Sequence, residues 1–240
     1  MDTTTTWFVE ALAEKGINLS PRQLEQFELY FRMLVDWNER MNLTGITERD
    51  AVYEKHFYDS VSLAFFVDIG RVKSLADIGS GAGFPSIPLK ICFPHLQVMI
   101  VDSLNKRIGF LNALVEQLGL DDVACIHGRA EDVARLTAYR DGFDLVTARA
   151  VARLNVLNEF CLPFVKKGGL FAAMKGSQSE EEVKEAATSF RELKGVLKAQ
   201  HAFRLPHEQS DRGIVLVSKR EATPRQYPRK AGTPLKQPIL

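Results

Sequence analysis

A glycine-rich turn follows a short apolar run in the first half of the chain. Gly79, Gly81 and Gly83 alternate with small residues directly after the sequence Leu-Ala-Asp-Ile at 75–78. Glycine permits a tight turn and lets a ligand approach the backbone closely. A dinucleotide-binding turn has a glycine at its sixth position. This chain has Phe84 there instead, which argues against a dinucleotide.

A carboxylate, Asp77, precedes the first glycine by two residues. It would repel a pyrophosphate, whereas it would attract the cationic amino-acid end of S-adenosylmethionine. We therefore expect this turn to bind S-adenosylmethionine. The alternatives are a dinucleotide site and a glycine turn that binds no ligand. The expected binding residues of the turn are Asp77, Gly79, Gly81, Gly83 and Phe84.

Two further strand ends supply the rest of such a site. Asp102 ends the next apolar run, about 20 residues after the glycines, where a carboxylate meets the hydroxyls of an adenosine ribose. Its alternative role is that of a helix N-cap. Ala130 and Glu131 follow a third apolar run and are expected at an adenine edge, although Glu131 could simply begin a helix. The three segments together are more specific than any one of them.

Cationic side chains follow the next two predicted strands. Arg149 and Arg153 come after the fourth strand and Lys175 after the fifth. Arg149 is a candidate for donor binding, and Arg153 and Lys175 are candidates for contact with RNA. The alternatives are salt bridges to local carboxylates and a solvated lysine.

The segment after the fourth strand also limits the chemistry. It reads Thr-Ala-Arg-Ala at 147–150, without the Asn-Pro-Pro-Tyr type of loop common in methylases of exocyclic amines. Methylation of a pyrimidine carbon needs a nucleophilic thiolate, and no cysteine lies in a plausible site loop. A ring nitrogen that has a free lone pair and carries no proton fits both absences. No general base is then required, and we assign no catalytic residue.

Polar residues near both ends of the chain are the remaining candidates for RNA contact. Asn38, Arg40 and Asn42 lie in a predicted polar loop over 38–47, and His56 on the following helix is more often a packed residue than a functional one. The C-terminal tail is basic, so phosphate neutralisation would make its binding to RNA salt-dependent. A solubilising tail is the alternative. The tail residues proposed to contact RNA are Arg229 and Lys230.

The period of the apolar residues predicts the elements that hold these side chains. Ser20, Pro21 and Gln23 form a capping box that begins a helix, and a further helix is expected over 48–67. From about residue 72, short apolar runs alternate with helical periods such as 104–118 and 179–194. The expected strands are Ser74–Ile78, Gln97–Val101, Val123–Ile126, Phe143–Thr147, Leu170–Met174 and Ile214–Ser218. The last of these is expected to pair with Ala199–Leu205 as a hairpin.

Alternation of strands and helices predicts an α/β fold with a doubly wound, mostly parallel sheet. Its strand C-termini share one edge, where ligands bind. We expect a helical N-terminal extension over 1–70, the Rossmann-like α/β domain over 71–220 and the basic tail over 221–240.

The composition is that of an ordinary globular protein, with 240 residues of which 45% are apolar and 25% charged. The three cysteines have no metal-binding or disulfide spacing, so we expect no metal site and a reducing compartment. No signal peptide and no membrane span are evident. We therefore expect a cytoplasmic protein without a membrane partner, and no oligomer is implied.

Several motifs, in order, resemble the RsmG (GidB) family of class I S-adenosylmethionine-dependent methyltransferases. They read WNERMNLTGI, DIGSGAGFPSIPLKI, GRAEDV, VTARAVARL, AMKG and YPRKAGTPLKQP. The resemblance spans about residues 37–238. It implies methylation of N7 of a guanine in bacterial small-subunit (16S) ribosomal RNA, on the RNA or the 30S particle. It also implies a donor site that includes Gly79, Phe84, Ala130, Glu131 and Arg149.

Two other functions remain open from the sequence. One is a ribosome-assembly factor that binds S-adenosylmethionine without turnover. The other is a nicotinamide-dependent dehydrogenase, which Phe84 at the sixth position of the turn disfavours.

Overall fold

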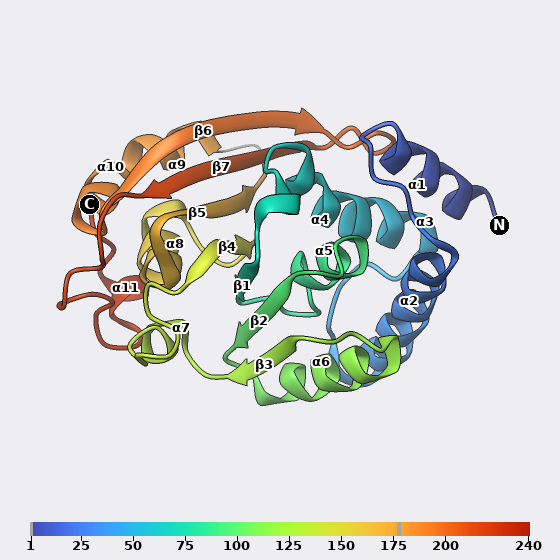
Figure 1. Cartoon of the computed structure of the whole chain (residues 1–240), viewed down its shortest axis with the longest axis horizontal. Coiled ribbons are helices and arrows are strands. Elements are labelled where there is room, and N and C mark those ends of the chain that lie inside the picture. Colours follow the sequence, from blue (N-terminus) through green and yellow to red (C-terminus); the bar gives the residue numbers. More distant parts are fainter. Residues whose placement is uncertain (1, 177–178) are drawn as a thin grey trace.

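The computed structural model describes residues 2–176 and 179–240. Its centre is a seven-stranded sheet in the order β3-β2-β1-β4-β5-β7-β6 (Figure 1). The strands are β1 (Ser74–Ile78), β2 (Gln97–Asp102), β3 (Val123–His127), β4 (Phe143–Arg149), β5 (Val165–Lys175), β6 (Gly195–Arg204) and β7 (Asp211–Lys219).

The first five strands are parallel and the last two form an antiparallel hairpin, with β7 inserted between β5 and β6. This confirms the predicted α/β fold and the hairpin. The C-terminal ends of β1 to β5 therefore lie along one edge, and β7 begins at that same edge because it runs antiparallel to β5.

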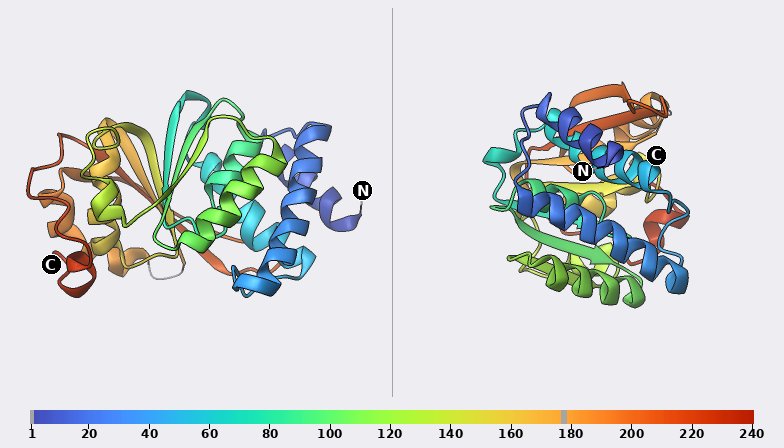
Figure 2. Two further views of the ribbon diagram at one scale, coloured as in Figure 1. Left: turned by 90° about the horizontal axis from the view of Figure 1, so that it is seen from below. Right: turned by 90° about the vertical axis from the view of Figure 1, so that its right-hand side faces the viewer.

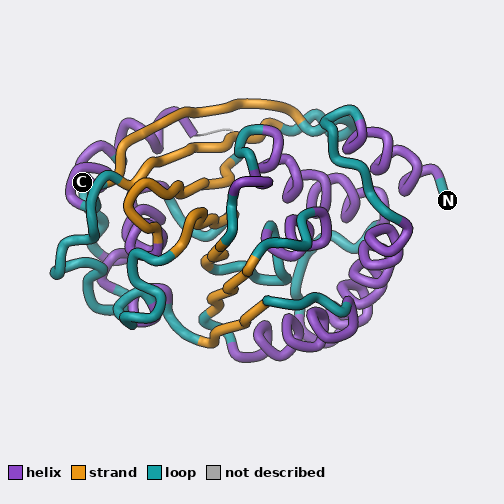
Figure 3. Tube along the Cα trace, viewed as in Figure 1, coloured by secondary structure: helices purple, strands orange, loops and turns teal. Residues whose placement is uncertain are grey.

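Helices cover both faces of the sheet (Figures 1, 2 and 3). One core joins a sheet face to α5 (Ser86–Cys92), α6 (Asn105–Leu118) and the N-terminal helices, and a second core joins the other face to the remaining helices. The remaining helices of this second core are α7 (Ala130–Val133), α8 (Leu154–Cys161), α9 (Ser179–Glu185) and α10 (Ala187–Glu192), and α11 (Thr233–Lys236) contacts α8.

The N-terminal helices are α1 (Thr3–Ala13) and α2 (Pro21–Met41), and α2 begins with the predicted capping box between Ser20 and Gln23. Helix α2 continues to Met41, so Asn38 and Arg40 lie on its last turn and not in the predicted loop. The same hydrophobic core contains residues of α2 and of β1, so these helices pack directly on the α/β part.

The helix expected over 48–67 is a composite. Helix α3 (Arg49–Val52) continues into a π-helical segment, η1 (Tyr53–Tyr58), then into α4 (Asp59–Val61) and a 3₁₀ turn, η2 (Ser62–Phe65). A π-helical turn inside a helix often marks a functional position. Further 3₁₀ turns are η3 (Ile69–Arg71) and η4 (Leu162–Phe164).

The predicted helix over 179–194 is divided at Ala186 into α9 and α10. The two helices therefore have different surroundings. Glu182 on α9 lines a cavity, whereas Phe190 on α10 packs in the core against α8. Within the described residues, no helix is both long and apolar enough to span a membrane.

Candidate active site

The glycine turn lies between β1 and α5, and its three glycines have left-handed backbone angles of 73°, 62° and 100°. The three positions do different things. A Cβ on Gly83 would lie 2.7 Å from the hydroxyl of Tyr30, so Gly83 is required by packing. A Cβ on Gly81 would meet no atom within 4 Å, and one on Gly79 would meet Val151. Gly79 and Gly81 line a cavity.

Asp77 lies under this turn and is fully buried. One carboxylate oxygen accepts hydrogen bonds from the hydroxyl of Ser86 at 2.6 Å and its amide at 3.2 Å. The other oxygen is buried without a hydrogen-bond partner, and so is the hydroxyl of Ser80. Burial raises the pKa of Asp77 to about 6. An unsatisfied acceptor beside the turn fits a cationic ligand group.

Asp102, at the end of β2, is also buried. Its carboxylate accepts hydrogen bonds from the amide of Gly81 at 3.0 Å and from that of Leu104 at 2.9 Å, and Arg107 lies 3.5 Å away. Asp102 thus joins β2 to the glycine turn and to the start of α6. This brings two of the three predicted strand ends together.

The third strand end is Ala130 and Glu131, at the beginning of α7. Glu131 is buried, and its carboxylate accepts a hydrogen bond of 2.8 Å from the amide of Gly232 in the C-terminal tail. Neither residue lines the cavity at the glycine turn, which has a volume of about 200 Å³. That cavity is lined by Leu43, Thr44, His56, Gly79, Ser80, Gly81, Ala82, Phe84, Arg107, Arg149 and Ala150.

A stack of rings covers the end of the glycine turn. His56, from the π-helical segment, stacks on Phe84 with the ring centres 4.6 Å apart, and Tyr30 stacks on the same ring at 5.4 Å. The ring nitrogen Nε2 of His56 lies 2.8 Å from the hydroxyl of Thr44. Burial and the charge of Arg149 lower the pKa of His56 to about 3, so His56 is neutral.

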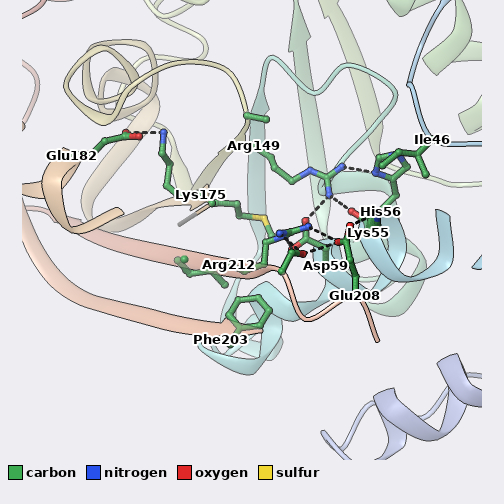
Figure 4. A pocket seen from close by; sticks show the side chains of 16 residues that line it. Ile46, Lys55, His56, Asp59, Arg149, Lys175, Glu182, Phe203, Glu208 and Arg212 are labelled. Atoms are coloured by element: carbon green, nitrogen blue, oxygen red, sulfur yellow. Dashed lines mark hydrogen bonds and ion pairs between the residues drawn. The ribbon is translucent and has the colours of Figure 1, made fainter. Parts of the chain in front are cut away.

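A second, larger cavity of about 660 Å³ adjoins the first, and His56, Arg149 and Ala150 line both. Figure 4 shows its walls. On one side, Arg149 donates a hydrogen bond of 2.9 Å to Asp59, whose other oxygen is paired with Arg212 at 3.2 Å. Arg149 thus has the carboxylate partner that the sequence left open as its alternative role.

On the opposite wall, Lys175 is paired with Glu182 at 2.7 Å and donates to the carbonyl of Ala152 at 2.8 Å (Figure 4). Both side chains are nearly buried, so Lys175 is not a solvated lysine. Glu182 also accepts from the amide of Leu154 at 2.7 Å. Arg153 instead points to Glu185 on the exposed surface, which matches its salt-bridge alternative.

The ionisable groups of this larger cavity are already engaged. Each carboxylate among its described lining residues, namely Asp59, Glu182 and Glu208, forms an ion pair with a cation. With neutral His56 a weak base, the described lining presents no unpaired base for proton removal.

The other predicted RNA contacts lie in two separate places. At the end of α2, Asn38 accepts from the amide of Thr44, Arg40 pairs with Asp36, and Asn42 ends the helix in a left-handed conformation. In the C-terminal tail, Lys230 is exposed, whereas Arg229 is paired with the buried carboxylate of Glu159. The structure does not bring the tail residues into the 660 Å³ cavity.

Sequence reasoning missed Arg107 in the lining of the smaller cavity and Glu182 and Arg212 in that of the larger one. It also missed Tyr30, which lines neither cavity but stacks on Phe84. Arg212 is the second residue of β7, and the antiparallel register pairs its neighbour Gly213 with Lys175, which places Arg212 beside the end of β5. A prediction of that register could have located Arg212. No local signal distinguishes Tyr30 or Glu182 from other residues on their helices.

Known proteins resemble this chain at two levels. Solved structures show the fold: a putative O-methyltransferase from Klebsiella pneumoniae is 14% identical with a TM-score of 0.58, covering 89% of this chain and 96% of its own. An O-methyltransferase from Bacillus cereus in complex with SAH is 15% identical with a TM-score of 0.57, covering 79% and 90%. These likenesses support the predicted class I, Rossmann-like methyltransferase fold.

Sequence relatives are far closer. The ribosomal RNA small subunit methyltransferase G of Bacillus pumilus is 59% identical, and that of Bacillus subtilis is 57% identical, each over 97% of both chains. The family model described as GidB, rRNA small subunit methyltransferase G, matches residues 23–210. The predicted methyltransferase activity, with S-adenosylmethionine as donor, is confirmed. The chain belongs to the family of rRNA small subunit methyltransferase G.

Proposed function

We propose that this chain transfers a methyl group from S-adenosylmethionine to N7 of a guanine in 16S ribosomal RNA. The observation that carries this proposal is the 660 Å³ cavity beside the glycine turn, whose described carboxylates are all ion-paired and whose histidine is neutral. An acceptor that must lose a proton needs a base. N7 of guanine carries no proton, so it suits this lining.

The donor site in this proposal is the smaller cavity and the strand ends beside it. The sulfonium of the donor supplies an already activated methyl group, so the protein's main task is to hold the two reactants in line. Asp77 attracts the ammonium group, and Asp102 and Glu131 serve the adenosine half. The full set is Asp77, Gly79, Gly81, Phe84, Asp102, Ala130, Glu131 and Arg149, whereas Gly83 supports the turn by packing against Tyr30.

The cysteines support a ring nitrogen over a pyrimidine carbon as acceptor. None of Cys92, Cys125 and Cys161 lines the larger cavity. Burial raises the pKa of Cys125 to about 11 and raises the pKa values of the other two thiols as well. The thiolate that carbon methylation would require is therefore disfavoured at all three positions.

The pair of Lys175 and Glu182 suits guanine as the base in the cavity. Nζ of Lys175 and Oε2 of Glu182 lie 2.7 Å apart. Lys175 uses two of its three N–H groups, on Glu182 and on the carbonyl of Ala152. Both bonds of Glu182, to Lys175 and to the amide of Leu154, use Oε2, so the pair still offers one donor and one acceptor to a base. Guanine presents O6, an acceptor, next to N1–H, a donor, whereas adenine presents the reverse order. Enzymes read an extruded base by hydrogen bonds to this edge. The pair therefore favours guanine over adenine.

The remaining RNA contacts are assigned by element. The end of α2, with Asn38, Arg40 and Asn42, contacts RNA outside the cavity, and so do Arg153 and Lys230. Residues 1–70 contribute to the lining of both cavities, and residues 71–220 carry the strand ends of the donor site. The substrate places the activity in the cytoplasm, on 16S RNA or the 30S particle.

The test is methyl transfer from tritiated S-adenosylmethionine to 30S particles and 16S RNA from a strain that lacks the enzyme, with the labelled nucleoside identified. The expected product is 7-methylguanosine. Another methylated nucleoside would overturn the acceptor assignment. Donor binding without label in RNA would support an assembly factor without turnover. The Gly79→Asp variant, which adds bulk and negative charge to the turn, serves as the inactive control.

A further inference from the structure

The last part of the chain, residues 223–240, is called the C-terminal segment here. It lies beyond residues 23–210, which the family model matches. It packs against α7 and α8, and α11 within it contacts α8 (Figure 1). Tyr227 and Pro234 are buried. The segment is therefore a packed part of the fold and not a free basic tail.

One anchor of the segment is Arg229. Its Nε and Nη2 atoms donate to the two carboxylate oxygens of Glu159 on α8, at 3.0 and 2.7 Å, and its amide donates to the same group at 2.6 Å. Glu159 is 1% exposed, so this carboxylate depends on Arg229 for its charge partner. Arg229 also donates to the carbonyl of Gln237, which folds the end of the chain back.

The segment also holds the loop and helix that follow β3. The amide of Gly232 donates to Glu131 at 2.8 Å, and Glu131 is 3% exposed. Arg135 donates to the carbonyl of Pro228, and Arg140 donates to that of Tyr227 at 2.8 Å. All three contacts run between the segment and residues 131–140, on the adenosine side of the proposed donor site.

We infer that the C-terminal segment is a positioning element of the donor site, which it serves by fixing Glu131 through the amide of Gly232. This inference rests on the proposed donor site and extends it to a part of the chain outside the family model. The inference also changes the role predicted for Arg229. The guanidinium of Arg229 forms an ion pair with Glu159 inside the protein, so it does not bind RNA phosphates.

The test compares the full chain with a chain that ends at Lys230. This truncation removes the Gly232 amide but keeps Arg229 and Tyr227. Lys236→Ala is the matched control, because it removes an exposed cation of the deleted stretch and leaves the Gly232 amide. Calorimetry measures the Kd of S-adenosylmethionine, and methyl transfer to 30S particles gives kcat and both KM values.

We expect the truncation to raise the Kd and KM of S-adenosylmethionine about tenfold, a usual size for coupling between two sites. At saturating donor, kcat and the KM for RNA should stay within about twofold, and Lys236→Ala should match the full chain. An unchanged donor Kd with a raised KM for RNA would overturn the inference and make the segment an RNA contact.

A second measurement needs no variant and covers the case in which the truncated chain fails to fold. Coupling is reciprocal, so donor binding must stabilise the segment. In the full chain, S-adenosylmethionine should slow hydrogen exchange of the Gly232 amide. Unchanged exchange there, in a protein that binds the donor, would overturn the inference. Failure of the full chain to bind S-adenosylmethionine at all would instead refute the proposed donor site.

Discussion

The guanidinium carbon of Arg149 lies 4.9 Å from the centre of the Phe84 ring. Phe84 follows the glycine turn and Arg149 ends β4. This contact therefore joins the proposed donor site to the cavity of about 660 Å³, where we propose that guanine binds. A largely desolvated contact of this kind contributes about 2 kcal/mol. Arg149 lines both cavities together with His56 and Ala150, so these three residues form the wall that the two sites share.

Donor binding should depend on pH through Asp77, because its pKa is raised to about 6 by burial. Below that pH the carboxyl is protonated and no longer attracts the ammonium group. The affinity for S-adenosylmethionine should therefore fall about tenfold between pH 8 and pH 5. Calorimetry across this range, repeated in buffers of different ionisation enthalpy, measures the affinity and the proton release.

The control for this prediction is Asp77→Asn. This variant should bind the donor more weakly at pH 8 and show a flat pH profile. A variant with the same pH dependence as the wild type would assign the titration to another group.

Stability should depend on pH through His56, whose folded-state pKa is lowered to about 3 against an ordinary value of 6.5. The fold favours the neutral form of His56. The contribution of His56 to the free energy of unfolding is therefore complete above pH 6.5 and is lost as the pH falls below that value. Between pH 7.5 and 5.5 the loss should be about 1.4 kcal/mol. Urea unfolding of wild type and His56→Asn at both pH values isolates this amount as a difference.

Asp77 acts in the opposite direction. Its folded-state pKa lies above the unfolded value, so its stabilisation is complete below about pH 3.8 and is lost as the pH rises through about 6. The wild type alone therefore shows only the difference of the two effects. If His56→Asn loses as much stability as the wild type between pH 7.5 and 5.5, the account of His56 is wrong.

The glycines of the turn should differ in what substitution costs. Gly83→Ala brings a Cβ within 2.7 Å of the Tyr30 hydroxyl at a left-handed backbone angle, and it should lower the free energy of unfolding by about 3 kcal/mol. Gly81→Ala meets no neighbouring atom and should cost only about 1 kcal/mol of backbone strain. Urea unfolding of both variants checks the order, and equal losses would contradict it.

These positions show how far the sequence determines the site. The strand ends and the glycine turn follow from local patterns, because apolar runs and glycine spacing act over a few residues. The position of a glycine in the turn does not show whether it serves packing, as Gly83 does, or faces a cavity, as Gly81 does. The packing role of Gly83 depends on its contact with Tyr30 from α2, which is distant in the sequence. Likewise, the partners of Arg229 and Glu131 are about 70 and 100 residues away in the chain, and no local pattern encodes such pairs.

Guanine recognition is tested by Glu182→Gln. The amide oxygen can still accept from Leu154, but the NH₂ group then presents a donor where guanine N1–H requires an acceptor. We expect kcat/KM for 30S particles to fall at least about tenfold, since a hydrogen-bonded base contact contributes about 1–3 kcal/mol of discrimination. The donor Kd should not change.

Glu180→Gln is the matched control, because Glu180 lies on the same helix, is exposed and does not line the cavity. It should retain full activity. Equal losses in both variants would trace the effect to α9 as a whole and remove Glu182 from base recognition.

The central claim is that the ends of β1, β2 and β3 hold one S-adenosylmethionine molecule. A crystal structure of the chain with S-adenosylhomocysteine tests it directly. We predict that the amino-acid end lies at Gly79 and Asp77, the ribose hydroxyls at Asp102 and the adenine beside Ala130. A ligand bound elsewhere, or side chains that fill the space between these three strand ends in the complex, would contradict the claim.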